Sequence, residues 1–122
     1  MLVKLGAALA TLTALIHIFV GHFDTLLPLL SSDLSPAVLG SFHACWHIVS
    51  VFLAYSAWRF WSGGQIAVHL AIIWILFSVI FVAVGIWQLG LGGLLILPQW
   101  VLLGPSGGLV LIGLRSAKQS MV

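Results

Sequence analysis

Long apolar runs dominate the chain and predict four membrane-spanning helices. The runs cover approximately Leu2–Phe23, Pro36–Phe60, Ile66–Gln88 and Gly93–Leu114. At about 1.5 Å per residue, each run is long enough to cross a hydrocarbon core of roughly 30 Å. The connections are short, so neighbouring spans are expected to be antiparallel. The sequence therefore predicts an all-α fold, an integral membrane four-helix bundle that forms a single transmembrane domain over residues 1–122.

The composition agrees with an integral membrane protein. Of the 122 residues, 62% are hydrophobic and only 5% are charged, too few charges for the surface of a soluble domain of this size. Lys4 precedes the first apolar run, as in a signal peptide, but that run continues to Phe23 with no small-residue cleavage site after it. We therefore expect a retained helix. The single cysteine, Cys45, excludes an internal disulfide.

The charged residues predict how the bundle is oriented. A four-span topology places all four cations on one side of the membrane: Lys4, Arg59, Arg115 and Lys118. The only acids, Asp24 and Asp33, fall in or beside the first connection, on the opposite side. By the positive-inside rule, the cationic side and both termini are expected to be cytoplasmic, as in a bacterial inner membrane. The net charge of +2 follows from this topology and gives no reason to expect a nucleic-acid partner.

Small and polar residues line one face of each of the first two predicted helices. Steps of three or four residues connect Gly6, Ala10, Thr13, His17, Gly21 and Asp24 in the first helix, and Gly40, His43, His47, Ser50 and Ala54 in the second. Polar groups in a bilayer normally face the bundle interior or water, and small residues allow helices to approach closely. We therefore expect the two faces to meet, with His17, His43 and His47 in the seam.

Several polar residues are expected at the same depth in the outer half of the bundle. His17 and His43 lie level with each other, His47 is one turn deeper, and Asp24 is near the outer mouth. The third connection lies on the same side and brings three cofactor-binding candidates to this depth: Gln88, Gln99 and Trp100. His22 follows His17 by five residues, about 140° around an ideal helix, so it joins the cluster only through a kink or a frayed end. Cys45 and His69 are expected to lie outside the cluster.

The spacing of His43 and His47 is suited to holding one metal ion. Neutral imidazoles bind zinc, copper, iron and nickel, and residues four apart share a helix face. With His17 opposite and Asp24 or His22 as a further ligand, the sequence predicts a mononuclear transition-metal site. The chain contains no glutamate, which argues against a carboxylate-bridged di-iron centre and favours copper or zinc.

Other functions remain open at this point. Haem b could be held by His17 together with His43 or His47, with glycines making room for the porphyrin. The chain could instead be an accessory subunit of a larger membrane complex or a homo-oligomer with structural histidines, or a proton-coupled transporter in which those histidines titrate. The catalytic residues are unknown. An enzymatic role would be metal-dependent redox chemistry on a lipophilic substrate, because no nucleophile sits with a base at a suitable spacing.

Two prolines interrupt the last apolar run. Pro98 and Pro105 lack a backbone N–H and crowd the carbonyl four residues earlier, so the carbonyls of Leu94 and Val101 lose their intrahelical partners. At membrane depth such carbonyls must be satisfied by neighbouring groups, water or a ligand. We expect a kinked fourth helix in close contact with its neighbours.

Overall fold

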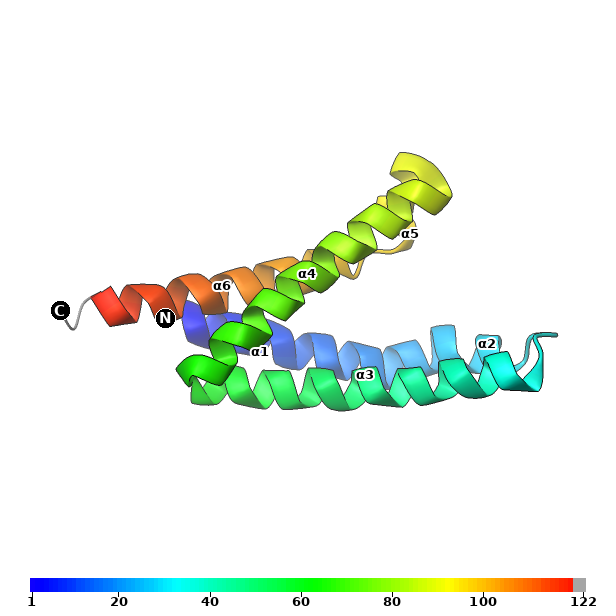
Figure 1. The fold of residues 1–122 in the computed structure, drawn as a ribbon, viewed down its shortest axis with the longest axis horizontal. Coiled ribbons are helices and arrows are strands. Elements are labelled where there is room, and N and C mark those ends of the chain that lie inside the picture. Colours follow the sequence, from blue (N-terminus) through cyan, green and yellow to red (C-terminus); the bar gives the residue numbers. More distant parts are fainter. Residues whose placement is uncertain (120–122) are drawn as a thin grey trace.

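Helices make up nearly all of this computed structural model, which describes the backbone of residues 1–119 and the side chains of residues 1–117 (Figure 1). The elements run in the order α1 (Leu2–Leu15), η1 (Ile16–Val20), η2 (His22–Leu26), α2 (Leu27–Leu30), α3 (Pro36–Ser62), α4 (Gly64–Leu89), η3 (Gly90–Gly92), α5 (Gly93–Ile96) and α6 (Trp100–Gln119). Four helical stretches are long and apolar enough to cross a membrane: Leu2–Leu30, Pro36–Ser62, Gly64–Ile96 and Trp100–Ala117. The predicted all-α architecture with four such helices is confirmed.

The last long helix begins later than the sequence predicted. Residues 90–96 form two short helical segments, η3 and α5, that directly follow α4, and α6 begins only at Trp100. Pro98 lies in the turn between them, where its missing N–H leaves no gap in a helix. The carbonyl of Leu94 accepts a hydrogen bond from Trp100 Nε1 at 3.0 Å. A neighbouring side chain therefore satisfies this carbonyl, one of the solutions expected from the sequence.

The first long helix changes geometry halfway along its length. η1 and η2 are π-helical, with Gly21 N–H bonded to the carbonyl of Ile16 and Leu27 N–H bonded to that of His22. A π-helix closes its hydrogen bonds over five residues instead of four. His17 and His22, five residues apart, therefore lie closer to one face than the roughly 140° of an ideal α-helix would allow.

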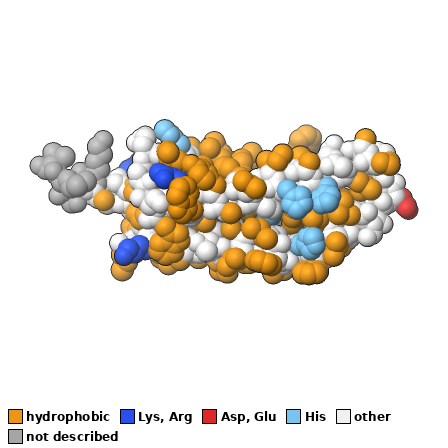
Figure 2. Space-filling model, turned by 90° about the horizontal axis from the view of Figure 1, so that it is seen from below, with side chains coloured by type: hydrophobic (Ala, Val, Ile, Leu, Met, Phe, Trp, Pro, Cys, Tyr) orange, Lys and Arg blue, Asp and Glu red, His pale blue; other side chains and the backbone are white. Residues whose placement is uncertain are grey.

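The charges separate along the long axis of the molecule. Figure 2 shows Lys and Arg side chains at one end, here called the cation end, and an acidic side chain at the other, here called the acid end. Lys4, Arg59 and Arg115 lie in the parts of α1, α3 and α6 that meet at the cation end, whereas Asp24 and Asp33 lie where α1 and α3 are connected. This separation agrees with the one-sided distribution of cations expected from the sequence.

The helices pack in the order α3, α1, α6, α4. α1 and α3 form one hairpin and α4 and α6 the other, and the two hairpins diverge toward the acid end (Figure 1). α3 and α4 contact each other near their connection, where Phe60 packs against Trp74 and Phe52 against Phe77, each with ring centroids 5.4 Å apart. Beyond Phe52, α4 leaves α3 and stays with α6. The acid end of the bundle is therefore formed by two separate pairs of helices.

The common core lies at the cation end and consists mainly of small side chains. Its buried members include Ala7, Ala10, Ala57, Phe60, Ala67, Ala71, Trp74 and Val110. Small residues let the backbones approach closely: a Cβ at Gly107 would lie 2.6 Å from the carbonyl oxygen of Ala71, and one at Gly6 would lie 2.7 Å from Val110 Cγ2. Such contacts drive helix association in a bilayer, where hydrophobic burial between helices adds little.

A glycine pair in α6 tests this packing. Gly107→Ala should lower the free energy of unfolding by about 1–3 kcal/mol, because the added methyl group must displace α4. Gly108→Ala is the matched control, since its Cβ would meet nothing within 4 Å; it should be neutral or gain up to about 1 kcal/mol. Thermal unfolding in detergent measures both. Equal effects of the two substitutions would contradict the close α4–α6 contact.

Candidate functional site

His43 and His47 form an exposed pair on the outer surface of α3. They lie one turn apart in an unbroken helix, and their ring centroids are 4.9 Å apart with planes tilted by 41°. Both side chains are exposed, and the structure gives neither ring a hydrogen bond within the described part of the chain. Figure 2, viewed from the side on which α3 lies, shows histidine side chains gathered toward the acid end. We refer to His43 and His47 as the histidine pair.

His17 lies in the seam between the η1 part of the first long helix and α3, where it stacks on Trp46. The two ring centroids are 4.1 Å apart and the planes differ by 19°. His17 Nε2 also lies 3.5 Å from the carbonyl oxygen of Trp46, at the limit of a hydrogen bond. The indole also reaches Gly21, between η1 and η2, where a Cβ would come within 2.8 Å of Trp46 Cη2. The α3 residue that lies on the ring of His17 is therefore Trp46.

The register of α3 differs from the predicted one. The positions Trp46, Ser50, Leu53 and Ala57 form a buried or half-buried line on α3, whereas His43 and His47 of the predicted face are exposed, and Ser50 belongs to both faces. A Cβ at Gly40 would meet nothing within 4 Å, and Ala54 is exposed. At 100° per residue, the centres of the two faces differ by roughly 70° around the helix. Two large side chains, Trp46 and Leu53, therefore fill this seam together with the small Ser50 and Ala57.

Trp46 is the residue that the sequence interpretation missed. The signal was present, because Trp46, Ser50, Leu53 and Ala57 follow one another at steps of four, three and four residues. These steps extend the buried side of α3 from the cation end toward the acid end. Ser50 Oγ donates a hydrogen bond to the carbonyl of Trp46 at 2.8 Å, so the same turn also positions that carbonyl near His17.

His22 and Asp24 lie on the π-helical part of the first helix and have neighbours of their own. The half-buried ring of His22 lies edge-on to Phe23, with centroids 5.3 Å apart. The carboxylate of Asp24 is exposed and accepts a hydrogen bond from Thr25 Oγ1 at 2.7 Å. Their closest polar and aromatic contacts are therefore within their own turn of helix.

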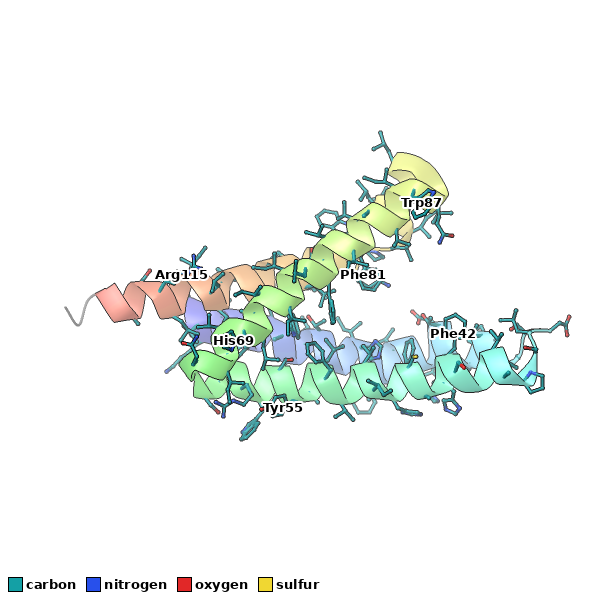
Figure 3. The ribbon with its side chains drawn as sticks, viewed as in Figure 1. Phe42, Tyr55, His69, Phe81, Trp87 and Arg115 are labelled. Carbon is teal, nitrogen blue, oxygen red and sulfur yellow. The ribbon has the colours of Figure 1, made fainter. Side chains whose placement is uncertain are left out.

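The three cofactor-binding candidates lie on the other hairpin. Gln88 is exposed near the end of α4, Gln99 is exposed just before α6, and Trp100 is half-buried with its Nε1 bonded to Leu94. Figure 3 shows Trp87, next to Gln88, at the diverging end of α4, far from Phe42 on α3. The divergence of the hairpins therefore separates these residues from the histidine pair, although the predicted depth is similar.

One chain does not assemble the predicted set of metal ligands. Among the described residues, no three His, Cys, Asp or Glu side chains lie close enough together to hold one metal ion. Cys45 is free and exposed, and His69 lies at the other end of the molecule, where it contacts Gln65 at 3.4 Å between the two Nε2 atoms (Figure 3). What a single chain offers is a two-ligand element on α3 with the His17–Trp46 stack beside it.

Comparison of the chain with protein-family models, curated proteins and solved structures finds no match. A fold alone does not identify a function, and a four-helix membrane bundle hosts many. The function must therefore be argued from the chemistry of the histidines and from the surface on which they lie.

The His17–Trp46 stack can be measured as a coupling energy. In a double-mutant cycle, His17→Ala and Trp46→Ala should show a coupling of about 0.5–1.5 kcal/mol, because each substitution alone removes the same ring contact. His69→Ala combined with Trp46→Ala is the control and should be additive within about 0.5 kcal/mol, since His69 lies at the opposite end. Denaturation in detergent supplies the free energies. An additive His17–Trp46 cycle would contradict the stack.

Proposed function

We propose that this chain is a small integral membrane protein that binds a transition metal ion, copper or zinc, through His43 and His47. The observation that supports this proposal is the geometry of the histidine pair. Two imidazoles one turn apart, exposed and without hydrogen bonds to the described part of the chain, can each turn an acceptor nitrogen toward a common ion. His17 has a different role in this proposal: its stack on Trp46 fixes the helix turn that carries the pair.

Two imidazoles leave the coordination of the ion incomplete. A structural zinc site has four ligands, and a catalytic one has three protein ligands plus an open position. The remaining ligands in this proposal come from outside the single chain, either from another protein chain or from water or a substrate. A copper ion held on the exposed face of α3 would be open to a lipophilic substrate arriving from the bilayer, which is the redox role expected from the sequence.

The proposed orientation has the cation end in the cytoplasm and the histidine pair toward the outer face of a bacterial inner membrane. The support is the separation of Lys4, Arg59 and Arg115 from Asp24 and Asp33 along the long axis (Figure 2). Cytoplasmic connections carry an excess of Lys and Arg, so this charge separation favours one orientation.

A second candidate function is an accessory subunit of a larger membrane complex. It is favoured by the exposure of α3, in which only 6% of the most apolar 18-residue window is buried. Polar side chains within a membrane normally face protein or water, and the histidine pair does so only if something covers α3. In this function the pair packs against a partner protein and needs no metal.

Metal analysis distinguishes these functions. The protein is purified in detergent, loaded with zinc or copper and freed of excess ion, and it should retain metal. His43→Ala or His47→Ala should weaken the metal affinity by at least about tenfold, because even the loss of a residue that only supports a metal ligand has that effect. His69→Ala is the control and should retain the metal. Full metal content in the His43→Ala, His47→Ala double variant would contradict metal binding at the pair. Loss of metal in His17→Ala but not in Trp46→Ala, which removes the same stack, would instead support the three-histidine site.

Cysteine labelling tests the orientation. In a Cys45→Ser background, Ser32→Cys at the acid end should react with a membrane-impermeant maleimide in intact cells. Ser62→Cys, at the end of α3 beside Arg59, should react only after the membrane is permeabilised. The reverse pattern would show that the cation end faces outward, and equal labelling of both would indicate dual orientation.

A further inference from the structure

The histidine pair offers two of the four ligands that a structural zinc site takes. Both rings lie on the exposed face of α3, and no third His, Cys, Asp or Glu among the described residues joins them. We infer that a second copy of this chain supplies the other half: two α3 helices pack side by side, and His43 and His47 of both copies hold one metal ion. This inference rests on the proposed metal-binding function and names the source of the missing ligands.

The exposed face of α3 has the shape that close packing of two copies requires. Gly40, His43, His47 and Ala54 lie along one stripe of the helix, here called the histidine stripe, and all four are exposed. Gly40 has open space where a Cβ would be, and Ala54 is exposed at the other end of the stripe. Small residues on both sides of a polar pair allow two helix backbones to come together in a membrane.

The charge distribution fixes the arrangement of the two copies. Cations gathered at one end give every copy the same orientation in the membrane, so two neighbouring α3 helices must be parallel (Figure 2). A closed dimer of parallel copies has its two-fold axis perpendicular to the membrane. Across such an axis each residue meets its own counterpart at the same depth. His43 therefore faces His43 of the other copy, and the two His47 side chains face each other one turn further along.

The chemistry of four neutral imidazoles suits zinc, which takes four nitrogen or sulfur ligands in tetrahedral closed sites, and also copper. Hydrophobic burial contributes little to helix association in lipid, so packing and polar interactions must hold the two copies together. The shared ion is the strongest interaction that this stripe offers. The dimer should therefore depend on the metal, and the metal content should be one ion for two chains.

Crosslinking across the histidine stripe tests the dimer in native membranes. Ala54→Cys in a Cys45→Ser background should form a disulfide-linked dimer on oxidation with iodine, which avoids adding copper, and a membrane-permeant zinc chelator should reduce the yield several-fold. The unsubstituted chain is the matched control, because Cys45 is exposed but lies about 200° around the helix from His43. A dimer through Cys45 instead of Ala54→Cys would overturn the inference.

A substitution that leaves the histidines intact tests the packing of the two α3 helices separately from metal binding. Gly40→Leu should lower the crosslinked fraction and the metal content several-fold, although the monomer has room for the side chain. Ser41→Leu, on another face of α3, should lower neither. Unaltered circular dichroism spectra of both variants in detergent show that the chain still folds.

The outcomes distinguish this inference from the proposed function. One ion for two chains, together with zinc-dependent crosslinking, supports both. One ion for each chain, lost in His43→Ala and without crosslinking, overturns the shared site and leaves metal binding by the pair intact. Crosslinking that the chelator does not change, in protein that contains no metal, overturns both the shared site and metal binding by the histidine pair. A product containing a different protein also overturns the shared site and supports the accessory subunit.

Discussion

Close approach of helix backbones at the cation end holds the bundle together. Gly6 on α1 lies against Val110 on α6, and Gly107 on α6 lies against the carbonyl of Ala71 on α4. A methyl group at either glycine would overlap the neighbouring helix. In lipid, where apolar side chains gain little by leaving the surroundings, this fit supplies much of the energy of association. The alanines around it keep the distances between the helices short.

The loss of this fit explains the shape of the acid end. Beyond the Phe52–Phe77 contact, the two hairpins separate, and each is held by its own seam. Trp46 of α3 packs against the π-helical part of the first long helix, in contact with His17 and Gly21. On the other hairpin, Gly93 of α5 lies directly on the carbonyl of Gly85. The histidine pair lies on neither seam, and its surroundings are therefore set by what lies next to the protein.

The sequence predicts the helices of this protein better than their faces. Apolar runs of about 20 residues leave few alternatives to membrane-spanning helices, and steps of three and four residues correctly identify Gly6, Ala10 and Thr13 as buried. The expected partner of Gly6 was wrong, because it packs against Val110 of α6 and not against the second long helix. The same steps fit two faces of α3. The polarity of His43 and His47 favoured the wrong one, because a large indole at Trp46 fills a seam as well as small residues do. Gln88 and Gln99 lie away from the histidine pair because the two hairpins diverge, and no local sequence pattern predicts this divergence.

The two π-helical turns of the first long helix uncouple the helical register of its first half from that of its second half. Each wide turn accommodates one residue more than an α-helical turn, so each is equivalent to a single-residue insertion absorbed without breaking the helix. The face that packs against α6 near Gly6 and the segment that carries His22 and Asp24 are thus offset from each other. Evolution can therefore change the polar residues at the acid end, and even delete one of them, without altering the register of the glycine contacts that hold the bundle together.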